Sequence, residues 1–132
     1  MKSNKKNVRN LFMIWLLTDS EFGVIQYADD KEVIQDVVDN LVQDMISPVS
    51  AKKWKGLRKI AQKSSVSVTA SYCSNYAYAA AAHSVPASYS DFSTVSYYAT
   101  IAYCHSNLKK HIESDWHIAA TNKLYELVEN AK

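Results

Sequence analysis

The fold is decided by residues 64–104, which read SSVSVTASYCSNYAYAAAAHSVPASYSDFSTVSYYATIAYC and contain one charged side chain, Asp91. Small or apolar residues recur at intervals of three and four on each side of Pro86, which is the spacing of a helix face. The four consecutive alanines at 79–82 also favour helix strongly. A helix that other helices surround has no face to leave charged. This stretch therefore predicts two central helices that meet at Pro86, the first of them starting near Val66.

Two amphipathic helices are expected before this stretch. Asp29 and Asp30 open the first, because acidic side chains accept hydrogen bonds from the free amides at a helix start and complement its dipole. Pro48 ends this helix, and Ser50 caps the next one, which is expected over 51–62. The outer face of the first helix is acidic and that of the second is basic. An antiparallel hairpin with complementary charged rims is the expected arrangement.

The two ends of the chain complete the prediction. A first helix is expected over 5–17, and Gly23 to Tyr27 fits either a short strand or a helical turn. The apolar spacing continues into a last helix over about 106–129. A break is expected near 105–107, since serine and asparagine side chains compete for backbone hydrogen bonds. We predict one all-α domain over residues 1–132, a compact bundle of four to six helices.

The composition excludes several classes of protein. Two glycines cannot build the phosphate-binding loops of P-loop or Rossmann proteins. Cys73 and Cys104 form no CxxC motif and fit the buried free thiols of a cytoplasmic protein, although their number allows one disulfide. The apolar run at 11–17 is at the short limit for a signal peptide, and no small-residue cleavage site follows it. The serines of the uncharged stretch make it too polar to span a bilayer, so we expect a cytoplasmic protein without membrane contact.

Tyrosine is concentrated in the uncharged stretch. A tyrosine ring packs well in a core when its hydroxyl finds a partner, so central packing is one explanation. The other is an interface, because tyrosine is favoured at protein-binding surfaces while lysine and glutamate are depleted there. One small core seldom needs so many hydroxyls, and part of this surface is expected to face another protein or a second copy of the chain. The candidate protein-binding residues are Tyr72, Tyr76, Tyr78, Tyr89, Tyr97, Tyr98 and Tyr103.

The histidines and cysteines do not form a recognisable catalytic or metal-binding pattern. His105, His111 and His117 are six residues apart, whereas ligands on one helix face need a spacing of three or four. Glu113 and His117 do share a face, but no second helix offers matching ligands. Cys104 and His105 are adjacent and cannot face each other on a helix. We predict a protein with no catalytic residues, no metal and no cofactor.

The basic helix over 51–62 supports an alternative function. Its cations surround Trp54 and could contact the phosphates of a nucleic acid. The same cations also suit a solvated face that balances the acidic helix before it, and the formal net charge of the chain is only +2. The acidic helix could conversely mimic the charge of a nucleic acid. The candidate nucleic-acid-binding residues are Lys52, Lys53, Lys55, Arg58 and Lys59.

Two segments of the second half of the chain are distinctive: the alanine- and tyrosine-rich segment from Tyr72 to Ala82, and the closing helix from Glu113 to Leu127, which contains Trp116. In these segments the chain resembles a diffuse group of small alanine-rich helical proteins from phages and from bacterial toxin–immunity systems. This chain has more serine and tyrosine than the group, and no functional residue carries over. The resemblance implies binding to another protein in a conflict between phage and host or between toxin and immunity protein.

These observations together predict a small non-enzymatic protein that acts by binding another protein. Its most concrete form is an inhibitor or immunity protein of the phage or mobile-element type, with a homodimer through the tyrosine-rich helices as one arrangement. The alternative is a nucleic-acid-binding accessory protein that uses the basic helix.

Overall fold

The computed structural model describes residues 2–86, 92–107 and 112–132, and these ranges contain helices and no strand. The prediction of an all-α bundle is therefore confirmed. Between the first two helices the chain forms a short 3₁₀ turn, Val24–Tyr27, so the ambiguous segment is a helical turn. The helices are α1 (Lys2–Thr18), α2 (Lys31–Ile46), α3 (Ala51–Ser65), α4 (Tyr72–Ser84), α5 (Phe92–Asn107) and α6 (Ile112–Asn130).

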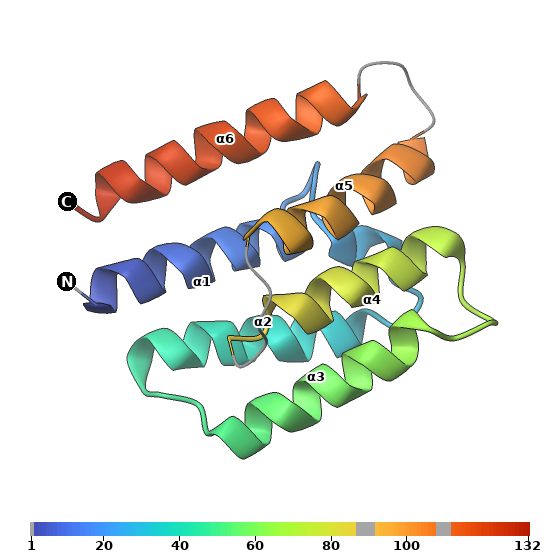
Figure 1. The fold of residues 1–132 in the computed structure, drawn as a ribbon, viewed down its shortest axis with the longest axis horizontal. Coiled ribbons are helices and arrows are strands. Elements are labelled where there is room, and N and C mark those ends of the chain that lie inside the picture. The colour runs from blue at the N-terminus through green and yellow to red at the C-terminus, as the bar shows by residue number, and fades with distance from the viewer. Residues whose placement is uncertain (1, 87–91, 108–111) are drawn as a thin grey trace.

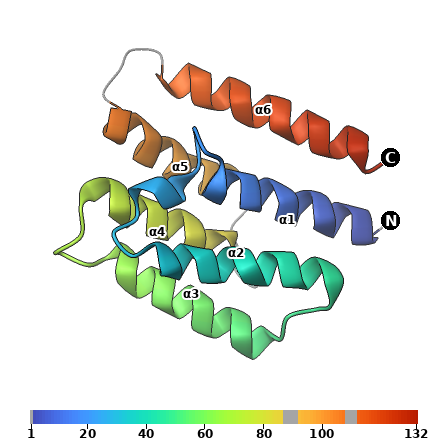
Figure 2. The same cartoon turned by 180° about the vertical axis from the view of Figure 1, so that it is seen from behind.

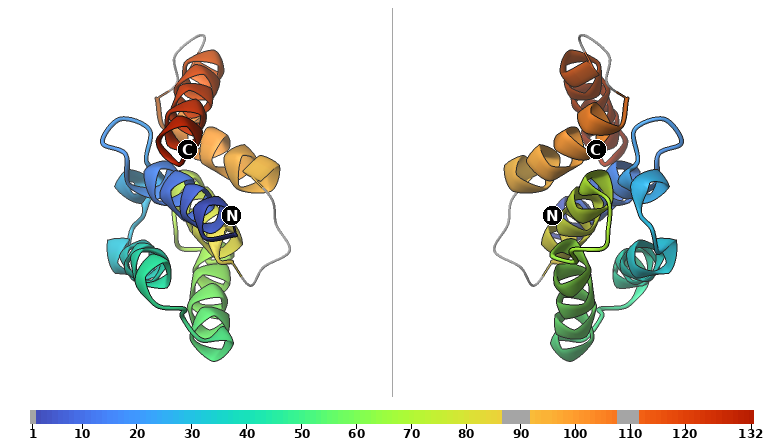
Figure 3. Two further views of the ribbon diagram at one scale, coloured as in Figure 1. Left: turned by 90° about the vertical axis from the view of Figure 1, so that its left-hand side faces the viewer. Right: turned by 90° about the vertical axis from the view of Figure 1, so that its right-hand side faces the viewer.

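The helices form a stack with α6 at one side and α3 at the other (Figure 1). Helix α4 packs extensively against both α3 and α5, as the uncharged stretch predicts, while α6 contacts only α1 and α5 among the described elements. Seen from behind, α1 and α6 run antiparallel (Figure 2), and the end-on views place the start of α1 and the end of α6 at the same end of the molecule (Figure 3). Helix α4 is therefore central and α6 peripheral.

The core is built from leucine, valine and tryptophan on the outer helices and from alanine on α4. Alanine lets neighbouring backbones approach closely, which is why a helix with four consecutive alanines can lie between two others. Three of these four alanines are almost completely buried. The largest fully buried side chains of the core include Met13, Leu16, Leu17, Ile34, Leu41 and Trp116.

The helix starts predicted at Asp30 and Ser50 are confirmed. The Asp30 carboxylate accepts from the Glu32 backbone N–H (3.1 Å) at the start of α2, and the Ser50 hydroxyl accepts from the Lys53 N–H (3.1 Å) at the start of α3. The start near Val66 is wrong, because α4 begins six residues later at Tyr72.

A cap on Ser71 sets the start of α4. The Ser71 hydroxyl accepts from the backbone N–H of Ser74 (3.2 Å), and this places the first helical residue at Tyr72. The β-branched residues before the cap lose side-chain freedom in a helix, and Val68 is 98% exposed, so nothing in the core holds this segment helical. The helical spacing of the residues over 66–70 is therefore not sufficient to make this segment part of α4.

The predicted complementary rims of α2 and α3 are wrong. All residues of both helices are described, and no ion pair joins them. Each helix packs its apolar face inward, and the acidic and basic faces point to solvent. Helix α3 packs chiefly against α4 instead. The basic side chains of α3 are therefore left without acidic partners in the described structure.

The break predicted near 105–107 separates two helices. Helix α5 continues to Asn107, and α6 begins at Ile112 rather than at 106. The four residues between them lie outside the described ranges.

A buried polar contact joins α1 to the end of α2. The side-chain amide of Asn10 donates to the Leu41 carbonyl oxygen (3.1 Å) and to the Asp44 carboxylate (3.3 Å), which also accepts from the Val49 N–H (2.9 Å). Lys6 pairs with the same carboxylate at 3.2 Å. Burial alone would raise the pKa of Asp44, but these hydrogen bonds and the lysine charge hold it below its usual value. The ionised Asp44 therefore ties the loop after α2 to α1.

Candidate functional site

Four of the tyrosines that the sequence singles out reach the surface. Tyr72 is 53% exposed and Tyr97 is 62% exposed, while Tyr76 and Tyr98 are half-buried. They come from α4 and α5, two helices with no charged residue from Tyr72 to Cys104 among the described residues. Tyr89 lies outside the described residues. The surface formed by these four side chains is uncharged and aromatic.

The exposed tyrosine rings contact one another in sequence. Tyr72 packs edge-on against Tyr76 with ring centroids 4.8 Å apart, and its hydroxyl donates to that of Tyr76 (3.3 Å). Tyr76 lies 5.9 Å from Tyr98, which is 5.6 Å from Tyr97. Such spacings are those of favourable aromatic pairs. Two histidines extend the contacts, and we call the whole set the aromatic row: Tyr72, Tyr76, Tyr97, Tyr98, His83 and His105.

The two histidines occupy opposite ends of the aromatic row. The His105 ring lies 4.6 Å from that of Tyr72, and the His83 ring lies 5.1 Å from that of Tyr98. Burial lowers the pKa of His83, and the positive charge of Arg58 on α3 lowers it further. His83 is therefore neutral at pH 7, and Arg58 lies where the aromatic row approaches α3. The sequence contained both histidines but offered no local signal that they would join the tyrosines.

Two of the seven tyrosines predicted to lie at a binding surface belong to the core instead. Tyr78 is buried, and its hydroxyl accepts from the Asp30 backbone N–H (2.6 Å) and lies 3.4 Å from the Asp30 carbonyl oxygen. This tyrosine therefore ties α4 to the start of α2. Tyr103 is also buried and packs against Phe22 with ring centroids 5.1 Å apart. Both positions are occupied in packing within the chain, so neither contributes to the candidate surface.

Lysines on α3 form a second surface feature. Positions 52, 55, 59 and 63 are separated by three, four and four residues, which aligns them along one face of the helix over about 16 Å. All four side chains are exposed, and none has an ion-pair partner within the described ranges. Lys53 and Arg58 lie off this line. We call the aligned residues the lysine stripe: Lys52, Lys55, Lys59 and Lys63.

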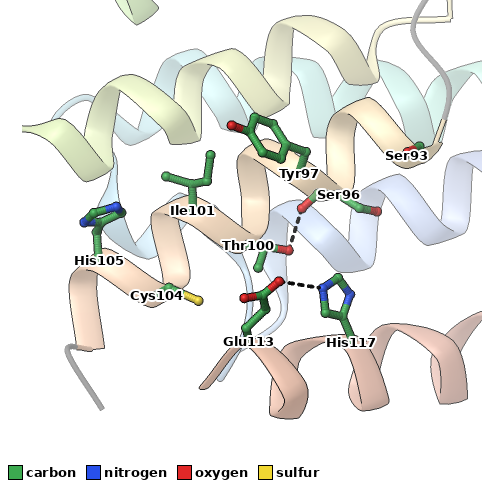
Figure 4. Close-up of a pocket in the computed structure, with 9 residues that line it drawn as sticks. All are labelled: Ser93, Ser96, Tyr97, Thr100, Ile101, Cys104, His105, Glu113 and His117. Atoms are coloured by element: carbon green, nitrogen blue, oxygen red, sulfur yellow. Dashed lines mark hydrogen bonds and ion pairs between the residues drawn. The ribbon is translucent and has the colours of Figure 1, made fainter. Parts of the chain in front are cut away.

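A hollow of about 540 Å³ lies between α5 and α6 (Figure 4). The wall from α5 carries Ser96, Thr100 and Cys104, and the wall from α6 carries Glu113 and His117. The Glu113 carboxylate lies 3.5 Å from His117 Nε2, one helical turn away. The Thr100 hydroxyl is already used, because it donates to the Ser96 carbonyl oxygen (2.7 Å). Tyr97 and His105 also line this hollow, so it borders the aromatic row.

A smaller hollow of about 210 Å³ continues along the same boundary. It shares Ser93, Ser96 and His117 with the larger one, and Phe92 and Trp116 supply apolar surface. We call the two hollows together the α5–α6 furrow. No pattern in the sequence indicated it, since its hydroxyls come from a stretch in which serine is common throughout.

The chemistry of the furrow does not resemble that of a nucleophilic or metal site. Cys73 and Cys104 are both free and half-buried. Burial raises the pKa of the Cys104 thiol, and the negative charge of Glu113 raises it further, which disfavours the reactive thiolate. Burial also raises the pKa of Cys73. Within the described ranges no three His, Cys, Asp or Glu side chains are placed to hold a metal ion.

Comparison with known proteins found no matching family model, curated protein or solved structure. In the described parts of the chain, no helix combines the length and apolar character needed to cross a membrane. The candidate surfaces are therefore characterised by their own residues: the aromatic row, the lysine stripe and the α5–α6 furrow.

Proposed function

We propose that this chain is a non-enzymatic binding protein that recognises another protein through the aromatic row. The observation that carries the proposal is the set of contacting aromatic rings on an uncharged surface, with Tyr72 and Tyr97 more than half exposed. An inhibitor or immunity role, as the compositional resemblance implies, is one form of such binding.

The aromatic row has the features of an interface centre. Tyrosine supplies a large contact area at low entropic cost, because its side chain has few rotatable bonds. The rings also hold one another in place, so less freedom is lost on binding. Arg58 of α3 lies close enough to the row for its positive charge to lower the pKa of His83. The partner that best complements this surface is a protein with an apolar or aromatic centre and an acidic edge.

The test uses three single tyrosine variants. Tyr72→Ala and Tyr97→Ala remove exposed rings of the row, while Tyr125→Ala removes a ring on α6 that is 70% exposed and lies outside the row. After capture of a partner from lysate and its purification, affinity is measured by calorimetry. Each row variant should lower affinity at least tenfold, as expected for truncation of a residue near an interface centre, and Tyr125→Ala should not. Equal effects of all three variants would refute the proposal.

Self-association is tested on the same proteins. If the partner is a second copy, sedimentation of the wild type should show a dimer that Tyr72→Ala and Tyr97→Ala dissociate. If the protein is a monomer at all concentrations and a different protein is captured, the aromatic row binds that protein rather than a second copy of the chain.

The lysine stripe favours nucleic-acid binding as a second candidate function. Four cations on one face without acidic partners form an electrostatic footprint for phosphates. The test is the salt dependence of binding to a labelled oligonucleotide. Phosphate binding weakens steeply with salt, and Lys55→Ala and Lys59→Ala should each reduce the log–log slope by about one. Lys53→Ala, off the stripe, is the matched control. Affinity that is independent of salt would exclude this function.

A further inference from the structure

The α5–α6 furrow contains a buried donor without a partner. Trp116 is 1% exposed and lines the smaller hollow, and its indole N–H has no acceptor in the described structure. A buried donor left unpaired destabilises the site, and an acceptor that reaches it restores that free energy. Native structures seldom leave such groups unsatisfied without a ligand, ion or water to pair them.

The surroundings of this donor select one kind of ligand. Phe92 and Trp116 give the smaller hollow an apolar wall, and the Ser93 and Ser96 hydroxyls add donors at its edge. The only acidic side chain of the furrow, Glu113, lines the larger hollow and not the smaller one. The smaller hollow measures about 210 Å³ and adjoins the larger one of about 540 Å³ at Ser93, Ser96 and His117, so a ligand that extends into both has the volume typical of small-molecule sites.

We propose that the α5–α6 furrow binds a small amphipathic molecule that carries a carbonyl or carboxylate group. Its apolar body lies against Phe92 and Trp116, and its oxygen accepts from the Trp116 indole N–H and the Ser93 or Ser96 hydroxyl. The indole N–H is itself buried, so the proposal requires α6, which contacts only α1 and α5 among the described elements, to shift when the ligand binds. The proposal does not rest on the function proposed for the aromatic row, although Tyr97 and His105 belong to both surfaces.

The test is an NMR titration with probes that share one apolar body. 2-Naphthoate and 2-naphthamide carry an acceptor, and 2-naphthylmethylamine carries a cationic donor in its place. The two acceptor probes should shift the indole N–H resonance of Trp116 and leave that of Trp54, a buried residue of α3, unchanged. The amine should bind about 2- to 12-fold more weakly, which is the range for one net hydrogen bond.

Two variants complete the test. Trp116→Phe keeps an aromatic ring without the N–H and should weaken binding of 2-naphthoate by the same factor. Ser93→Trp fills the furrow from an exposed position, so folding should survive while binding is lost. Ser114→Trp, on α6 but outside the furrow, is the control and should bind as the wild type does. An indole resonance that does not respond to millimolar probe, or unchanged binding to Ser93→Trp, would overturn the proposal.

Discussion

Replacing glycine by alanine should have opposite effects on stability at the two glycines of this chain, Gly23 and Gly56. At Gly23, just before the 3₁₀ turn, an added Cβ would lie 2.4 Å from the Asp19 backbone nitrogen, 2.5 Å from its carbonyl oxygen and 2.6 Å from the Thr18 carbonyl carbon. The Gly23 N–H also donates to that Asp19 oxygen (2.8 Å). At Gly56, inside α3, an added Cβ would meet nothing within 4 Å. Gly23→Ala should therefore destabilise the protein, and Gly56→Ala should stabilise it.

The magnitudes follow from these surroundings. The three atoms nearest to the new Cβ of Gly23→Ala are all backbone, so the end of α1 and the 3₁₀ turn must separate. Such overpacking costs about 1–3 kcal/mol. Gly56→Ala replaces glycine in an exposed helix interior, which stabilises by about 0.8–1 kcal/mol. For a chain of 132 residues, 1 kcal/mol corresponds to about 3–4 °C in Tm, so the expected shifts are about −4 to −11 °C and about +3 °C.

The assay is urea denaturation followed by circular dichroism, with a thermal melt as the second measurement. Both variants should keep the wild-type m-value, because the surface exposed on unfolding is unchanged. The reasoning is refuted if Gly23→Ala has the midpoint of the wild type, which would mean that the close backbone approach is absent. It is also refuted if Gly56→Ala lowers the midpoint, which would mean that this position is not open.

Three further predictions concern single polar groups. The pKa of Asp44 is lower in the folded chain than its unfolded value of about 3.9, so its stabilisation is complete above that pH and is lost as the pH falls through the folded pKa. The free-energy difference between the wild type and Asp44→Asn, measured by denaturation, should therefore shrink from pH 6 to pH 3; a constant difference would contradict the assignment. Tyr78→Phe removes the hydroxyl that pairs with the Asp30 backbone and should lower the free energy of unfolding by about 0.5–1.5 kcal/mol. A denaturation midpoint equal to that of the wild type would contradict this prediction. Ser71→Ala removes the cap of α4 and should cost about 0.5–2 kcal/mol by the same measurement, whereas Ser71→Asp should retain most of the stability.

Local signals in the sequence predicted most of the helix starts and stops. Asp30 and Ser50 could be assigned as caps because a single polar side chain precedes each amphipathic run. The start of α4 could not be assigned in this way, since several serines precede Tyr72 and any of them could cap a helix. The choice of Ser71 depends on where α4 docks between α3 and α5, because only the buried part of the periodic stretch gains enough from packing to be helical.

The candidate surfaces likewise depend partly on signals in the sequence and partly on packing that the sequence does not reveal. In the tyrosine-rich helices no charge marks the outward face, so periodicity could not tell buried Tyr78 from exposed Tyr72. The lysine stripe could be read from its spacing, but its lack of acidic partners depends on how α2 and α3 face solvent. The α5–α6 furrow had no sequence signal at all.

The sequence by itself determined that this chain is an all-helical bundle and that its uncharged stretch is central. The spacing of apolar residues indicates both that a segment is helical and which of its faces is buried. Composition and spacing are therefore sufficient for that conclusion. The tertiary structure alone decided which tyrosines face outward, that two histidines join them, and that a furrow lies beside the unpaired indole of Trp116. These outcomes depend on the rotation of each helix about its axis, and in α4 and α5 only packing against neighbouring helices sets that rotation.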